Sequence, residues 1–254
     1  MRKTLLRAHV LAVVGLLVAV GSALAITLHA SNLVITTDGG FTPTALPKHG
    51  YAPIRLHGFG KIATEDGSPP PVLETVTIWF DKHGEVETRG LPTCTPQKLA
   101  ATTTKQARKL CPGAIVGTGF GKAVVDFPEQ GPIPASSPIT LFNAKPKHGN
   151  PVILAHAHLT VPGPTTFVVP IEIQKVHDGR YGFKTEAKIP RIAGGYGIPL
   201  YARISVGRKW KYKGKTLSFA NAGCPDGRLQ AKGQFLFKDG TFLQGSVFKK
   251  CKGI

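Results

Sequence analysis

The sequence predicts an all-β protein with a β-sandwich-like fold of about a dozen strands. Gly contributes 30 residues and Pro 21, and both are spread along the chain rather than gathered in one tract. Apolar segments rich in β-branched residues lie between most of these breaks. Short strands joined by turns are typical of β-sandwiches. A helix is predicted in one segment only, between Cys94 and Cys111.

The clearest predicted hairpin joins residues 74–80 to residues 85–88. β-branched and aromatic residues flank an Asp-Lys-His-Gly turn at 81–84, with Asp at its start and Gly where a positive φ is needed. We therefore expect these two segments to pair with each other.

A second hairpin is predicted for residues 229–238 and 241–248, around an Asp-Gly turn at 239–240. Three of its aromatic residues are expected in the core: Phe235, Phe237 and Phe242. The other strands are expected at residues 30–36, 54–62, 114–125, 138–142, 152–160, 166–176, 182–189, 200–206 and 216–220.

The predicted helix follows Thr95, whose side chain can cap it, and Pro96 suits the first helical position. Residues 97–109 are mainly compatible with a helix, and Pro112 prevents its continuation. If the flanking cysteines are joined, the helix is held at both ends on the surface of the β body.

Residues 1–25 have the pattern of a signal peptide. Three basic residues precede an apolar run at 10–20, and Ala23 and Ala25 form an A-x-A cleavage site before Ile26. The alternative is an uncleaved membrane anchor, which normally needs about 20 apolar residues. We therefore expect an exported chain that acts outside the cytoplasm, free or bound to the cell envelope.

The mature chain, residues 26–254, is expected to form a single domain. A Pro-rich segment at 128–138 is the alternative boundary, because the charge balance changes close to it. Residues 26–140 hold 10 basic and 9 acidic groups, whereas residues 141–254 hold 19 basic and 5 acidic groups. The excess positive charge therefore belongs to the second half.

An even number of cysteines in an exported chain indicates disulfides. Of the three possible connectivities, Cys94–Cys111 with Cys224–Cys251 is the most economical, because each bond closes a local loop. A zinc site is the alternative, and the absence of any C-x-x-C pair argues against it.

The densest basic segment spans residues 208–215. If it is extended, its two aromatic rings share one face and its lysines share the other. Such a cationic row is able to hold a polyanion. The simpler interpretation is an edge hairpin with solvated lysines and rings packed inward. The candidate polyanion-binding residues are Arg208, Lys209, Trp210, Lys211, Tyr212, Lys213 and Lys215.

His156 and His158 would point to the same face of a strand, as in some metal sites of β proteins. A metal needs a third and a fourth ligand, and no spacing in the sequence identifies one. The alternative is two histidines that hydrogen-bond to neighbours on a partly covered face. No motif indicates catalytic residues, and no cofactor is expected.

Several motifs carry a family resemblance. They are Leu91-Pro92-x-Cys94, Cys111-x-x-Ala114-x-Val116-Gly117-x-Gly119, Ile189-Pro190-x-Ile192-Ala193-Gly194-Gly195, Cys224-x-Asp226-Gly227, Phe237-x-Asp239-Gly240 and Cys251. In these motifs the chain resembles an uncharacterised family of secreted bacterial β-rich proteins with two local cysteine pairs. The resemblance implies export, the local cysteine pairing and a β fold, and it implies no activity.

We expect a non-enzymatic extracellular or envelope-associated protein whose basic second half contacts an anionic envelope polymer or a membrane surface. Nucleic acid is a less favoured partner. The rival hypothesis is a secreted hydrolase or carbohydrate-active enzyme whose site residues come from separate strands. A third hypothesis is a purely structural component of the envelope.

Overall fold

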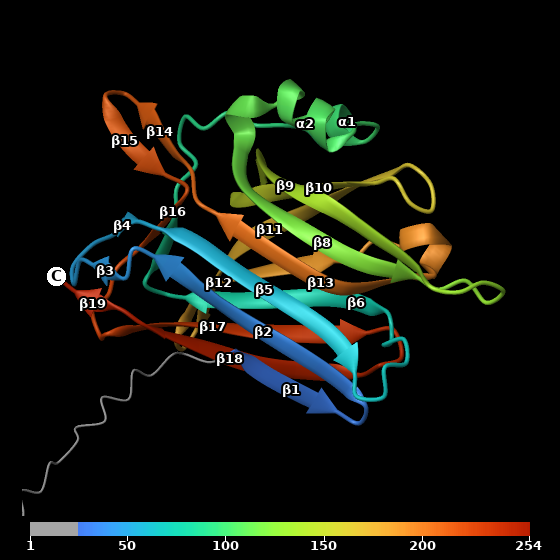
Figure 1. Cartoon of the computed structure of the whole chain (residues 1–254). Coiled ribbons are helices and arrows are strands. Elements are labelled where there is room, and N and C mark those ends of the chain that lie inside the picture. Colours follow the sequence, from blue (N-terminus) through green and yellow to red (C-terminus); the bar gives the residue numbers. More distant parts are fainter. Residues whose placement is uncertain (1–24) are drawn as a thin grey trace, which may run out of the picture.

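The computed structural model describes residues 25–254, and most of them lie in β-strands (Figure 1). The predicted all-β fold class is confirmed. Except for Ala25, the expected signal peptide lies outside the described residues.

Within that range, twelve strands form one antiparallel sheet in the order β1-β2-β5-β13-β8-β9-β10-β11-β12-β6-β17-β18. Their bounds are β1 Ile26–Ala30, β2 Leu33–Thr42, β5 Arg55–Thr64, β6 Leu73–Asp81, β8 Ile115–Val125, β9 Ile133–Lys147, β10 Asn150–Leu159, β11 Thr165–Asp178, β12 Tyr181–Lys188, β13 Gly197–Val206, β17 Arg228–Phe237 and β18 Phe242–Lys250.

The other strands form three smaller sheets. They are the hairpin β14 Lys209–Tyr212 and β15 Lys215–Ser218, the three strands β4 Ala52–Pro53, β16 Ala220–Ala222 and β7 Gly84–Val86, and the pair β19 Lys252–Gly253 and β3 Ala45–Leu46. The helical elements are α1 Pro96–Leu99, α2 Thr104–Leu110, η1 Pro112–Ala114 and η2 Ile192–Gly195.

Among the described residues, no helix has the length and apolar character needed to cross a membrane.

The large sheet curls round until its two edge strands, β1 and β18, lie side by side (Figure 1). Gly245 on β18 makes this approach possible, because a Cβ there would lie 2.7 Å from Ile26 Cδ1 and 2.8 Å from Leu28 Cδ2 on β1. Beyond the end of β1, Lys249 Nζ on β18 lies 2.8 Å from Asp38 Oδ1 on β2. Side chains therefore close this seam, which carries no backbone ladder.

The core explains why the sheet curls. One apolar cluster combines Leu33 and Ile35 of β2 with Phe235 and Phe237 of β17 and with Leu243 of β18. These strands stand at opposite ends of the sheet order, so their apolar faces are buried only when the sheet turns back on itself. The inner face of the sheet is therefore the core, and the outer face meets solvent or the helices.

The two disulfides have the predicted pairing. Cys94 is bonded to Cys111 and Cys224 to Cys251, which closes loops of 17 and 27 residues. All four sulfurs are thus occupied, so the alternative of a cysteine-ligated zinc site is wrong.

The prediction of one helix between Cys94 and Cys111 is wrong, because the structure has two short helices there. Thr95 and Pro96 begin α1 as expected, and its N-cap side chain accepts a hydrogen bond from the Lys98 backbone. The chain then breaks, and the side chain of Thr103 caps α2 through a capping box with Gln106. A threonine run that competes for backbone hydrogen bonds divides the helix.

Both helices cover part of the outer face (Figure 1). α2 contacts β9 and β10, and α1 contacts β11. Leu99 and Ala107 of the helices pack against Phe142 of β9 and Leu154 of β10, and all four side chains are buried.

The hairpin predicted at residues 229–248 is confirmed, with Phe235 opposite Leu243. Phe235 and Phe237 are buried, but the prediction for Phe242 is wrong, since its side chain is 50% exposed. Phe242 pairs with Leu236, which alternates with the buried residues of β17, and it therefore faces outward.

The prediction of a hairpin around residues 81–84 is wrong. The turn forms, but β6 pairs with β12 and β17, whereas β7 pairs with β16. The prediction assumed that strands adjacent in the sequence pair with each other. The neighbours of β6 instead come from about 100 and 150 residues further along the chain.

Three other predicted strands have different limits. The one at 30–36 is a hairpin that turns at Ser31 and Asn32, with Ser31 at a φ of 52°. The one at 216–220 is divided between β15 and β16, and the one at 138–142 is the middle of the longer β9. Residues 126–132 connect β8 to its neighbour β9 in the same sheet.

Gly119→Ala tests the close packing of β8 on β13. A Cβ at Gly119 would lie 2.3 Å from the Arg203 carbonyl oxygen, so the backbone has to move, and we expect a loss of about 1–3 kcal/mol in the free energy of unfolding. Gly60→Ala on β5 is the matched control, since a Cβ there meets no atom within 4 Å. Urea unfolding measures both variants, and equal losses would contradict the packing argument.

Candidate functional site

The basic segment at 208–215 forms the β14–β15 hairpin, which projects beside the helices at one end of the molecule (Figure 1). Tyr212 pairs with Lys215, so Lys213 and Gly214 form a two-residue turn. Both turn residues have positive φ values, 47° and 75°, as a type I′ turn requires. The expected edge hairpin is therefore present.

The two faces of the hairpin differ as predicted. Lys209 and Lys211 are exposed, whereas Trp210 and Tyr212 are half-buried on the other face. Lys213 departs from the expected lysine row, because it belongs to the turn and its Nζ lies 5.6 Å from the centroid of the Tyr212 ring.

Contacts of the two rings hold the hairpin against the body. Trp210 packs on a core cluster that includes Leu91 and Phe219, and its Nε1 donates a hydrogen bond to the Arg89 carbonyl oxygen at 3.0 Å. The Tyr212 ring occupies the space beside Gly90, where a Cβ would lie 2.0 Å from Tyr212 Cδ2. Both rings therefore have a structural role, because they attach the hairpin to the body.

Arg208 has a structural role as well. Its Nη1 donates hydrogen bonds to the carbonyl oxygens of Pro112 at 2.9 Å and Ile115 at 2.8 Å. It thus ties the base of the hairpin to the segment after α2. Of the seven candidate residues, the exposed cations are Lys209, Lys211, Lys213 and Lys215.

Acidic residues are absent from the segments around these lysines. Residues 88–125, 130–171 and 187–225 contain no Asp or Glu, although they hold six, two and eight Lys or Arg residues. These segments form the hairpin, both helices and the strands β8, β9, β10 and β13. The positive field at this end of the molecule is therefore weakly neutralised by its own segments.

One ion pair lies at the border of this region. Arg89 is exposed and donates hydrogen bonds to the carboxylate of Glu87, with Nε 2.8 Å from Oε2. The bond lowers the pKa of Glu87 and raises that of Arg89.

The structure places His156 and His158 in hydrogen bonds with threonines. His156 is fully buried, and its Nε2 lies 3.1 Å from both Thr102 Oγ1 and the Thr102 carbonyl oxygen. Burial lowers the pKa of His156. His158 Nδ1 lies 2.8 Å from Thr166 Oγ1. Among residues 25–254, no group of three His, Cys, Asp or Glu side chains is arranged to hold a metal ion.

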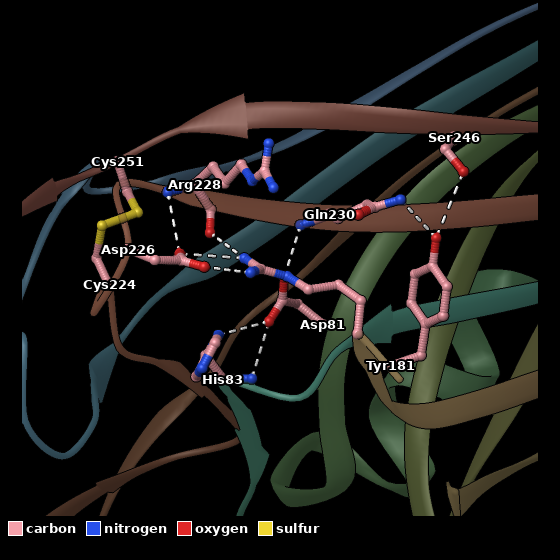
Figure 2. Close-up of polar contacts among 10 residues, drawn as sticks. Asp81, His83, Tyr181, Cys224, Asp226, Arg228, Gln230, Ser246 and Cys251 are labelled. Atoms are coloured by element: carbon pink, nitrogen blue, oxygen red, sulfur yellow. Dashed lines mark hydrogen bonds and ion pairs between the residues drawn. A yellow bond between two sulfur atoms is a disulfide. The ribbon is translucent and has the colours of Figure 1, made fainter. Parts of the chain in front are cut away.

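A polar network that the sequence did not reveal surrounds Asp81 (Figure 2). This carboxylate is 5% exposed, and its Oδ2 accepts hydrogen bonds from Arg180 Nε at 2.6 Å and from the Gln230 backbone at 2.9 Å. Its Oδ1 accepts the His83 backbone N–H at 3.0 Å and lies 2.8 Å from His83 Nδ1. A buried carboxylate needs such partners.

Through Arg180 the network reaches Asp226. Asp226 lies close to the second disulfide (Figure 2). The Arg180 guanidinium pairs with Asp226, two residues after Cys224, and donates to the Arg228 carbonyl oxygen at 2.6 Å. The hydrogen bond with Asp226 raises the pKa of Arg180, and the same bond lowers the pKa of Asp226 to about 2. The network therefore ties the ends of β6, β12 and β17 to the disulfide loop.

This network favours a structural role over a catalytic one. The contact between Asp81 and His83 resembles the Asp–His pair of a hydrolytic triad, but among the described side chains no hydroxyl or thiol is hydrogen-bonded to His83. From the sequence, Asp81 was interpreted as a turn residue and Asp226 belonged only to a motif of the family resemblance. Arg180 stands 99 residues from the first and 46 from the second. No local signal was able to connect them.

Asp226→Asn tests this ion pair through pH. The folded-state pKa of about 2 is below the ordinary 3.8, so the pair stabilises the fold above about pH 4 and loses this effect as the pH falls toward 2. Asp226 is 41% exposed, and screening by water limits the effect to about 1 kcal/mol or less.

Urea unfolding of wild type and variant, from about pH 2 to about pH 7, measures the difference in the free energy of unfolding. We expect it to be constant near neutral pH and to vanish at the acid end. Glu74→Gln is the control, because Glu74 is exposed and has no ion pair among the described residues. A gap that persists at the acid end would contradict the assignment.

Comparison with models of known protein families and with curated proteins finds no match for this chain. The residues and geometry described above therefore carry the functional inference.

Proposed function

We propose that the protein acts outside the cytoplasm as a non-enzymatic binding protein. Its partner is an anionic polymer of the cell envelope or an anionic membrane surface, which it contacts through the β14–β15 hairpin. The observation that carries this proposal is the set of four exposed lysines on a fixed hairpin, in segments that contain no carboxylates.

The hairpin geometry favours attraction by charge alone. Lysines are point charges on flexible stems, and they attract polyanions without the geometric demands of arginine. Because Trp210 and Tyr212 are packed against the body, they are not free to stack on a ligand. Single-stranded nucleic acid is bound through such stacking, so this surface suits it less well.

The proposed location rests on two supports. The first 25 residues have the pattern of a cleaved signal, and the four cysteines are paired. Disulfides persist in oxidising compartments and are rare where thioredoxin and glutathione keep thiols reduced.

Replacing the four hairpin lysines with glutamine should weaken polyanion binding. We expect wild type to bind heparin and vesicles rich in anionic lipid at low salt, and to lose affinity as salt rises because ions screen exposed charges. The variant should bind at least about tenfold more weakly, since each lysine near an anionic surface contributes about 1 kcal/mol.

The control variant removes four exposed lysines from other parts of the molecule: Lys175, Lys188, Lys238 and Lys252. It has the same net charge as the hairpin variant, so any difference in binding between the two variants reports the position of the lysines and not the total charge. Equal binding by both variants would show that only total charge matters and would contradict a hairpin site. Salt-independent binding of wild type would contradict the proposal itself.

Expression of the full chain in a bacterial host tests the proposed export. We expect a mature product that begins at Ile26 and contains no free thiol, because the signal is removed and all four cysteines are paired. Mass spectrometry of the intact protein with and without alkylation measures both properties. A cytosolic product that keeps residues 1–25 would contradict export.

A further inference from the structure

A groove crosses the outer face of the sheet next to the seam between β2 and β18. It consists of two adjoining depressions with volumes of about 430 and 600 Å³, and His57 lines both of them. Gly40 leaves room for this ring, since a Cβ at Gly40 would lie 2.9 Å from His57 Nε2. The two depressions therefore meet at one imidazole.

Strand alternation places the side chains of the first depression on the outer face. On β13, Ile204 and Val206 pack on the core, so Tyr201, Arg203 and Ser205 point the other way. The register sets Arg203 opposite Phe59 of β5. The residues that line the first depression include Asp38, His57, Phe59, Tyr201, Arg203 and Ser205.

The second depression lies where β18 approaches β2. The residues that line it include His57, Arg228, Phe248, Lys249 and Lys250. Phe248 is 50% exposed, so its ring presents an apolar surface to the groove.

The groove is cationic. Four Lys and Arg residues line its two parts, and Asp38 is the one carboxylate among the described lining residues. That carboxylate lies 2.8 Å from Lys249 Nζ, so its charge is already matched at the seam. Arg203 and Arg228 make no ion pair with any described side chain, and their guanidinium charges remain available.

Both arginines are held by aromatic rings. The Arg203 guanidinium lies 6.0 Å from the Phe120 ring centroid, and the Arg228 guanidinium lies 6.0 Å from that of Phe248. Stacking on a ring leaves the N–H edge of a guanidinium open, and this edge matches carboxylate and phosphate groups in a bidentate manner.

The groove also offers a platform of rings. Phe59 and Tyr201 are half-buried neighbours whose centroids are 6.3 Å apart with an interplanar angle of 30°. Aromatic faces fixed on a sheet suit the apolar C–H faces of sugar rings. A polyanion without rings, such as polyphosphate, would leave this surface uncovered.

We propose that the groove binds an extended anionic polysaccharide. Its sugar rings lie on Phe59, Tyr201 and Phe248, and its acidic groups bind Arg203 and Arg228. This inference deepens the proposed function by naming the polymer class, and it rests on that function for the extracytoplasmic location alone. The hairpin lysines attract the chain over a distance, whereas the groove selects it.

Calorimetry on the mature protein with both disulfides intact tests the groove. The probes are a decamer of galacturonate, polyphosphate of equal charge and a neutral glucan of equal length. We expect the galacturonate to bind about tenfold more tightly than either other probe, because it alone uses both rings and guanidinium groups.

Three groove variants test the residues. Arg203→Gln and Arg228→Gln should each weaken galacturonate binding about tenfold. Tyr201→Leu keeps an apolar side chain and removes the ring, so it should weaken galacturonate and leave polyphosphate unchanged. Arg191→Gln, at an exposed arginine outside both depressions, is the matched control. The urea unfolding midpoint shows that each variant is folded.

The outcomes separate this inference from the proposed function. Equal affinity for polyphosphate and galacturonate, or full affinity in folded groove variants, would overturn the proposal that the groove binds the polysaccharide. If the variant without the four hairpin lysines then fails to bind the anionic probes, the proposed function holds although the groove proposal does not. Wild type that binds neither anionic probe at low salt would overturn both.

Discussion

Closure of the sheet is the constraint on which the rest of the structure depends. β2 and β17 are the second and the eleventh strand from the same end of the strand order, and their apolar faces are buried together only because the sheet curls. Gly245 permits the approach of β1 and β18, and the Asp38–Lys249 ion pair continues the seam. Burial of apolar surface supplies the driving force, and the seam contacts set the alignment.

The same closure separates the two faces by chemistry. Along β13, Ile204 and Val206 enter the core, while Tyr201 and Arg203 remain outside with the groove. At the last position of β6, the buried Asp81 carboxylate accepts a hydrogen bond from Arg180. Arg180 in turn pairs with Asp226, which is close to the second disulfide. Both oxygens of the buried Asp81 carboxylate accept hydrogen bonds, whereas Arg203 on the outer face is exposed.

Charge and packing act together at the proposed interface. The hairpin is fixed to the body by contacts of Arg208, Trp210 and Tyr212. Its lysines therefore lie on a rigid support. A fixed array of charges loses less conformational entropy on binding than a flexible tail does. The acid-free segments that surround the hairpin also supply β8 and β13, so hairpin and groove belong to one positively charged part of the molecule.

The sequence by itself determined the all-β class, the two local cysteine pairs, the 229–248 hairpin and the alternating faces of the 208–215 segment. These features depend on residues that are close along the chain, where turn chemistry and the two-residue period of a strand act. The tertiary structure alone decided the partners of β6, the network around Asp81 and the groove beside Arg203. Each requires strands that are far apart in sequence to meet, and only burial of the shared core brings them together.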